Sequence, residues 1–139
     1  MKHFVLFCSL LGLVACQSNA DVTPVPLTNE IVGTYQTNSF MNYLCLTLSA
    51  NQMPTVTLHA TDDHTATLII TQSFPKSSVQ TIRDVSLIQQ PDQSIELRLA
   101  GQVIGTIQKG RVFTASGMET QGNLLQLSTS TIDFTGYRP

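Results

Sequence analysis

The chain has 139 residues, of which only 12% are charged, and its formal net charge is −2. This length suffices for one domain with its own core and hardly for two. Because so few residues are basic, the surface offers nothing to recruit nucleic acid electrostatically, and we exclude nucleic-acid binding as its function.

The first residues predict export. A positive start, "MKH", precedes a run from Phe4 to Ala15 that is apolar apart from Ser9. About a dozen helical residues, at roughly 1.5 Å each, are too short to cross a bilayer comfortably. Residues 1–15 are therefore predicted to be a signal peptide.

The end of this run, "LVAC", resembles the lipobox of bacterial lipoproteins. The resemblance implies cleavage between Ala15 and Cys16, a fatty-acid (palmitate) anchor through the Cys16 thiol, and loss of Cys8 with the signal peptide. Gln17 stands where many Gram-negative lipoproteins that stay in the inner membrane have Asp, which favours an outer-membrane anchor facing the periplasm. The alternatives are an ordinary secretory signal with a chance cysteine, or a short buried helix.

The next segment, residues 16–30 ("CQSNADVTPVPLTNE"), has two prolines and neither a helical nor a strand period. We expect a flexible tether here and a single domain over residues 31–139. With Cys8 removed and Cys16 lipidated, Cys45 has no partner within the chain. Neither an intramolecular disulfide nor a thiolate zinc site is expected.

From Ile31 onward, short β-rich segments alternate with turn residues. Within residues 43–50, for example, Leu44, Leu46 and Leu48 alternate with other residues, which gives a strand one face to bury. The pattern predicts an all-β fold, a small antiparallel meander barrel of about eight strands, with a two-sheet β-sandwich as the alternative. We expect strands near 31–38, 43–50, 55–61, 65–74, 79–89, 94–100, 102–108, 111–116 and 123–134, and turns at 61–65, 90–94, 100–102, 109–111 and 121–123.

Two stretches, "GTYQTNSFMNYLCLTLSANQMPTVTLHATDDHTATLIITQSF" and "SIELRLAGQVIGTIQKGRVFTASG", resemble the small β-barrel domain of NlpE-like outer-membrane lipoproteins. The resemblance covers most of residues 31–128 and rests on strand order and spacing. It implies a barrel that binds a partner or senses envelope stress. The family often carries a Cys-x-x-Cys pair near the second strand, where this chain has only Cys45, so copper binding or redox sensing by paired thiols is not implied.

One cluster has the residue types of a metal site. The segment "HATDDH" places His59, Asp62, Asp63 and His64 within six residues, and two imidazoles with two carboxylates are ligands that zinc and copper accept. Asp is also favoured in tight turns, because its side chain bonds the turn backbone. We therefore expect a hairpin turn here, and no metal or other cofactor.

Catalytic patterns are missing from the sequence. There is no Gly-x-Ser-x-Gly motif and no glycine-rich phosphate loop, and no histidine is placed near Cys45 by the pattern. We do not expect an enzyme. Three hypotheses follow: a membrane-anchored binding or stress-sensing module with an envelope protein as partner, an inhibitor of a periplasmic or host hydrolase such as lysozyme, and a structural envelope protein. The inhibitor hypothesis rests on "DFTGYRP", which resembles the Ser-Gly-x-x-Tyr loop of lysozyme-inhibitor lipoproteins but has Thr135 in place of Ser.

Overall fold

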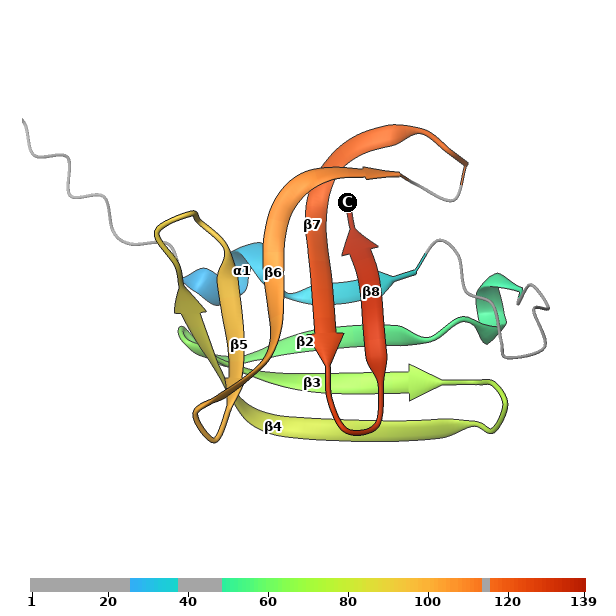
Figure 1. The fold of residues 1–139 in the computed structure, drawn as a ribbon, viewed down its shortest axis with the longest axis horizontal. Coiled ribbons are helices and arrows are strands. Elements are labelled where there is room, and N and C mark those ends of the chain that lie inside the picture. The colour runs from blue at the N-terminus through green and yellow to red at the C-terminus, as the bar shows by residue number, and fades with distance from the viewer. Residues whose placement is uncertain (1–25, 38–48, 114–115) are drawn as a thin grey trace, which may run out of the picture.

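The computed structural model of this chain describes residues 26–37, 49–113 and 116–139 (Figure 1). Within these residues eight antiparallel strands form a closed barrel, and each strand pairs with its neighbour in sequence. The last strand returns to the first through the register pair of Gln36 and Tyr137. The predicted all-β meander barrel is confirmed, and the sandwich alternative is wrong.

Ten elements make up the described part of the chain. They are, in order, α1 (Leu27–Ile31), β1 (Gly33–Gln36), the 3-10 turn η1 (Ala50–Gln52), β2 (Thr55–Asp62), β3 (Thr65–Gln72), β4 (Ser78–Gln89), β5 (Ile95–Leu99), β6 (Gln102–Phe113), β7 (Glu119–Ser128) and β8 (Asp133–Arg138).

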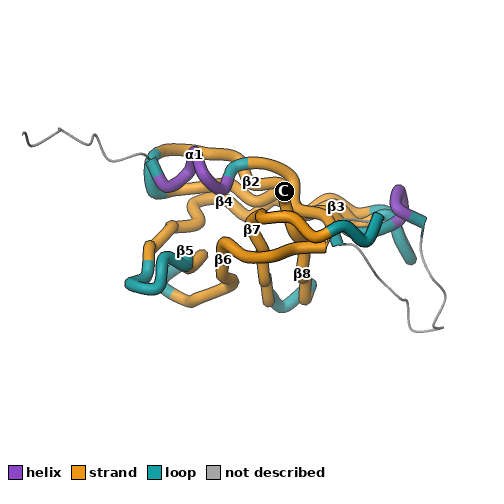
Figure 2. The backbone as a smooth tube through the Cα atoms, turned by 90° about the horizontal axis from the view of Figure 1, so that it is seen from above, coloured by secondary structure: helices purple, strands orange, loops and turns teal. Residues whose placement is uncertain are grey.

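The strands divide into two groups that cross each other. β2, β3 and β4 lie side by side along a common axis with alternating direction, and β7 and β8 run steeply across them (Figure 1). β4 and β6, each of 12 residues, are the longest strands. Seen from above, α1 lies along one side of this arrangement, where it contacts β2 and β4 (Figure 2).

The barrel interior is an apolar core. In β3 the side chains of Ala66, Leu68 and Ile70 are buried, while the alternate residues Thr67 and Ile69 are half-buried on the outer face. This period of two is what the sequence pattern predicts for a strand with one buried face. The largest fully buried side chains are Tyr35, Ile31, Leu58, Leu68, Leu97, Leu125, Val56 and Val85.

Two predicted turns, at 109–111 and 121–123, are wrong. Gly110 and Gly122 lie opposite each other inside the β6–β7 ladder. Residues 102–108 and 111–113, which were expected in two separate strands, therefore belong to the single strand β6. Glycine was interpreted as a turn residue, but it also fits a strand where backbones approach closely. A Cβ added at Gly122 would lie 2.6 Å from the carbonyl oxygen of Arg138.

The predicted strand over 123–134 is in fact two strands. β7 ends at Ser128 and β8 begins at Asp133. The turn between them is closed by Thr129, whose N–H donates to the carbonyl of Ile132 over 2.9 Å. The Thr129 hydroxyl accepts from the N–H of Thr131 over 3.3 Å. The Thr129 hydroxyl therefore bonds the backbone of this turn, which contains neither glycine nor proline.

The folded part begins earlier than Ile31. Residues 27–30, which the sequence assigns to the tether, form α1 with Ile31, and Thr28 and Ile31 are 3% and 1% exposed. Ala50, predicted at the end of a strand over 43–50, belongs to η1. The signal peptide, Cys16, Cys45 and the alternating leucines lie outside the described residues. No helix in the described ranges has the length and apolarity needed to cross a membrane.

Candidate binding groove

Three side chains hold α1 against one end of the barrel, and we call Tyr35, Asn123 and Arg138 the α1 clasp. The Tyr35 hydroxyl donates to the carbonyl of Ile31 over 3.0 Å. Asn123 Nδ2 donates to the carbonyl of Glu30 over 2.7 Å, and Arg138 Nη2 donates to the same oxygen. These contacts satisfy carbonyl groups at the end of a helix that have no partner within it.

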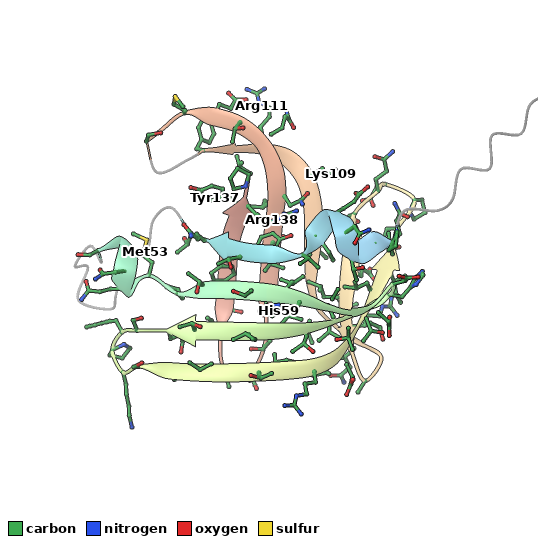
Figure 3. All side chains as sticks on the ribbon, turned by 180° about the vertical axis from the view of Figure 1, so that it is seen from behind. Met53, His59, Lys109, Arg111, Tyr137 and Arg138 are labelled. Atoms are coloured by element: carbon green, nitrogen blue, oxygen red, sulfur yellow. The ribbon has the colours of Figure 1, made fainter. Side chains whose placement is uncertain are left out.

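The charges around the clasp are few. An exposed ion pair of 2.6 Å joins Lys109 Nζ to Glu30 Oε2. Glu30 is also the residue whose carbonyl the clasp binds. Lys109 and Arg138 lie close to α1 and β1 in Figure 3. Burial raises the pKa of the Tyr35 phenol, and the Arg138 guanidinium beside it offsets part of that rise. Burial therefore keeps Tyr35 neutral and donating over the physiological range of pH.

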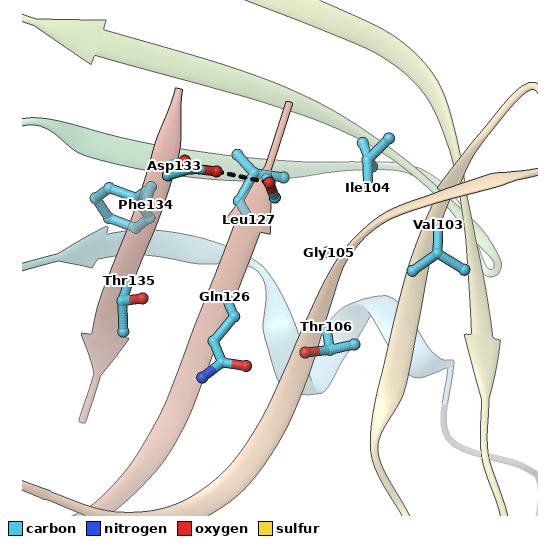
Figure 4. A pocket seen from close by; sticks show the side chains of 10 residues that line it. Val103, Ile104, Gly105, Thr106, Gln126, Leu127, Asp133, Phe134 and Thr135 are labelled. Atoms are coloured by element: carbon cyan, nitrogen blue, oxygen red, sulfur yellow. Dashed lines mark hydrogen bonds between the residues drawn. The ribbon is translucent and has the colours of Figure 1, made fainter. Parts of the chain in front are cut away.

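A groove of about 400 Å³ lies along β6, β7 and β8 (Figure 4). Thr106 on β6 faces Gln126 on β7 in the register, and Gln126 faces Thr135 on β8. We call these three residues the polar row. Gln126 and Thr135 are exposed, and Thr106 is half-buried. The row alternates with inward-facing core residues, so its side chains lie on the outer face of the barrel.

The two ends of the groove differ in chemistry. At one end Asp133 Oδ1 accepts from the hydroxyl of Ser128 over 2.6 Å. At the other end lie Ile104 and Val103, and Val103 is 51% exposed. Between them β6 approaches β7 so closely that a Cβ at Gly105 would lie 2.5 Å from the Gln126 carbonyl. Glycine at position 105 therefore permits this close approach of β6 and β7 beneath the groove.

The lining of the groove suits binding rather than catalysis. Asp133 is the one ionisable side chain among its ten lining residues. Threonine hydroxyls and the glutamine amide each donate and accept hydrogen bonds. A general base next to a nucleophile, or a set of metal ligands, is not among these ten side chains. Their chemistry matches a neutral ligand that carries hydroxyl or amide groups.

The four candidate metal ligands His59, Asp62, Asp63 and His64 lie away from the groove, on β2 and on the turn that follows it. His59 is exposed on β2 and faces Thr67 (Figure 3). The N–H of His64 donates to Asp62 Oδ1 over 2.8 Å, and this bond holds the pKa of the Asp62 carboxyl below its usual value. Asp63 and His64 form the exposed turn itself. Within the described ranges, no group of three or more His, Cys, Asp or Glu residues is placed to hold a metal ion.

The sequence does not reveal the clasp or the polar row, because each joins residues from distant strands. Alternation indicates which residues face outward, but not which strands become neighbours. The sequence predicts Thr135 in a loop, whereas it lies within β8. Comparison with known proteins adds no assignment: no family model, no curated protein and no solved structure matches this chain.

Proposed function

We propose that this protein is an envelope lipoprotein, anchored in the outer membrane through Cys16, whose barrel is a binding or stress-sensing module facing the periplasm. The observation that carries the proposal is the attachment of the predicted anchor segment to the barrel. Cys16 precedes Leu27, the first residue of α1, by 11 positions. Even fully extended, 11 residues span only about 40 Å. A barrel held by α1 would therefore stay near the membrane surface.

A binding role fits the outside of the barrel better than its inside. The inward faces of the described strands carry the apolar core, with Leu58, Leu68 and Leu97 fully buried. Small barrels that bind a ligand in the lumen leave room for it there. The hydroxyl and amide side chains of the polar row lie on the outside, in the groove of β6, β7 and β8. We therefore assign binding to that outer surface.

The position of "DFTGYRP" in the fold does not favour the inhibitor alternative. That alternative requires "DFTGYRP" to be a loop that enters an enzyme cleft, but residues 133–138 of this segment form β8 and pair with β7 along their length. A purely structural envelope protein remains the alternative. It predicts that cross-linked envelopes yield no stoichiometric partner, whereas a binding module predicts that one is recovered.

The anchor is tested with the three cysteines of the chain. In cells fed labelled palmitate, the parent protein should be labelled and recovered with the membranes. Cys16→Ser should abolish both results, because the acyl group attaches through that sulfur. Cys8→Ser and Cys45→Ser are matched controls that should keep both. Labelling that survives Cys16→Ser would exclude the lipoprotein assignment.

A further inference from the structure

We propose that the groove of β6, β7 and β8 binds a neutral saccharide, on the end of the barrel that points away from the membrane. The position relative to the membrane rests on the function proposed above. The saccharide chemistry rests on the groove alone.

The two ends of β7 and β8 have different neighbours. Asn123 and Arg138 are register partners at one end, and both hold α1, through which the anchor segment enters. Ser128 and Asp133 are register partners at the other end, and both line the groove. Five residues of strand separate Asn123 from Ser128, which is about 17 Å at 3.4 Å per residue. The groove thus lies at the end of β7 and β8 opposite to the end that holds α1.

The polar row matches hydroxyl-rich ligands. Sugar hydroxyls donate and accept hydrogen bonds, as do the side chains of Thr106, Gln126 and Thr135. The row crosses three adjacent strands, so it is about 10 Å long at 4.8 Å per strand. The groove volume of about 400 Å³ lies in the range of small-molecule sites. Half-exposed Val103 provides an apolar surface at the end of the row for the C–H face of a sugar ring.

Charge decides between classes of saccharide. Lys and Arg are absent from the ten lining residues, so the groove has no cation to pair with an acidic sugar. The Asp133 carboxylate would also repel such a ligand. It accepts hydrogen bonds from hydroxyl groups, which a neutral sugar supplies. The groove is therefore matched to uncharged saccharides and mismatched to uronic acids or phosphorylated sugars.

A peptide that extends the sheet is disfavoured by the position of the row. Such a peptide adds to an unpaired strand edge. Gln126, the middle residue of the row, lies on β7, which is paired with β6 on one side and β8 on the other. At Gln126 the groove therefore presents a side chain on a sheet face, where the main chain is already paired on both sides.

The inference is tested on the full lipoprotein in nanodiscs with three probes: an N-acetylglucosamine trimer, a galacturonic acid trimer and an uncharged tripeptide. We expect only the neutral trimer to bind, as measured by calorimetry. Gln126→Ala and Thr135→Val should each weaken its binding by about 2- to 13-fold, the loss expected for one hydrogen bond of 0.5–1.5 kcal/mol. Thr81→Val, an exposed threonine on the outer face of β4, is the matched control and should leave the affinity unchanged.

The outcomes separate the two proposals. No binding of the neutral trimer, binding that Gln126→Ala leaves unchanged, or preference for the acidic trimer or the tripeptide would overturn the saccharide assignment, while palmitate labelling would still support the anchor. Trimer binding by a chain that is not labelled would support the saccharide site and overturn its placement away from the membrane. In the anchored protein, a paramagnetic lipid headgroup should broaden the Val32 amide signal more than that of Thr135, and the reverse would overturn that placement.

Discussion

The side chain of Arg138 passes directly over Gly33, so that a Cβ added at Gly33 would lie 2.8 Å from Arg138 Cδ. Gly33 also has a φ of +136°, a backbone conformation that residues with a side chain rarely adopt. This position is the start of β1, directly after α1. Glycine here therefore allows Arg138 to reach the carbonyl of Glu30 and to close the clasp.

Gly33→Ala is expected to lower the free energy of unfolding by about 2–4 kcal/mol, because backbone strain and the contact with Arg138 act together. Gly101→Ala is the matched control. Gly101 also has a positive φ, of +83°, but no atom lies within 4 Å of its added Cβ. Its loss should be only about 1 kcal/mol. Urea unfolding measures both, and equal losses would show that the contact with Arg138 does not matter.

Asn123→Ala should release α1 more readily than it unfolds the barrel. The variant removes a buried donor to the Glu30 carbonyl, worth about 1–2 kcal/mol. Hydrogen exchange of the Val32 amide, which donates to Thr28 within the helix, reports this opening. It should become about 5- to 30-fold faster. Gln108→Ala, an exposed amide on β6, is the control, and an equal acceleration there would contradict the clasp.

The stability of the protein should fall in alkali. Burial raises the pKa of Tyr35, so the folded protein keeps the phenol proton at a pH where the unfolded chain has released it. The contribution is complete below the unfolded pKa of about 10 and is lost as the pH rises from there through the folded pKa. Urea unfolding at a series of pH values from 8 upward measures this loss. Tyr35→Phe should be less stable at neutral pH and should lack this part of the alkaline decline.

Adjacent residues of β3 should respond very differently to truncation. Leu68 is 0% exposed within the core, and Leu68→Ala is expected to cost about 2–5 kcal/mol through the cavity that it leaves. Ile69 lies on the outer face and is half-buried. Ile69→Ala should cost roughly 1 kcal/mol, because it removes less buried apolar surface. Thermal unfolding compares the two, and similar losses would mean that the faces of this strand are assigned wrongly.

The sequence predicts this fold well where alternation and turn chemistry agree. β2 and β3 follow the alternation of apolar and threonine residues, and the Asp62 side chain closes the turn between them. Prediction from the sequence fails where one residue type has two structural uses. Gly110 and Gly122 lie inside the β6–β7 ladder, where Gly122 permits a close approach to Arg138, and Thr129 closes a turn that lacks glycine and proline.

The candidate groove could not be predicted in the same way. Its polar row draws Thr106, Gln126 and Thr135 from three strands, and nothing local in the sequence relates them. Their neighbours in space follow from the pairing of whole strands. The short segment before Ile31 fails for a similar reason: α1 is stabilised by Asn123 and Arg138, which are far away in the chain.

The clasp also sets the order in which this protein can finish folding. Two residues donate hydrogen bonds to the carbonyl of Glu30: Asn123, which lies 93 residues later in the chain, and Arg138, which lies 108 residues later. A ribosome adds residues from the N-terminus, so α1 emerges long before the partners that hold it. Contacts this distant form slowly, because the whole intervening chain must first be ordered. During synthesis α1 therefore stays undocked until the last strand is made, and the pairing of β8 closes the barrel and fixes α1 in the same step.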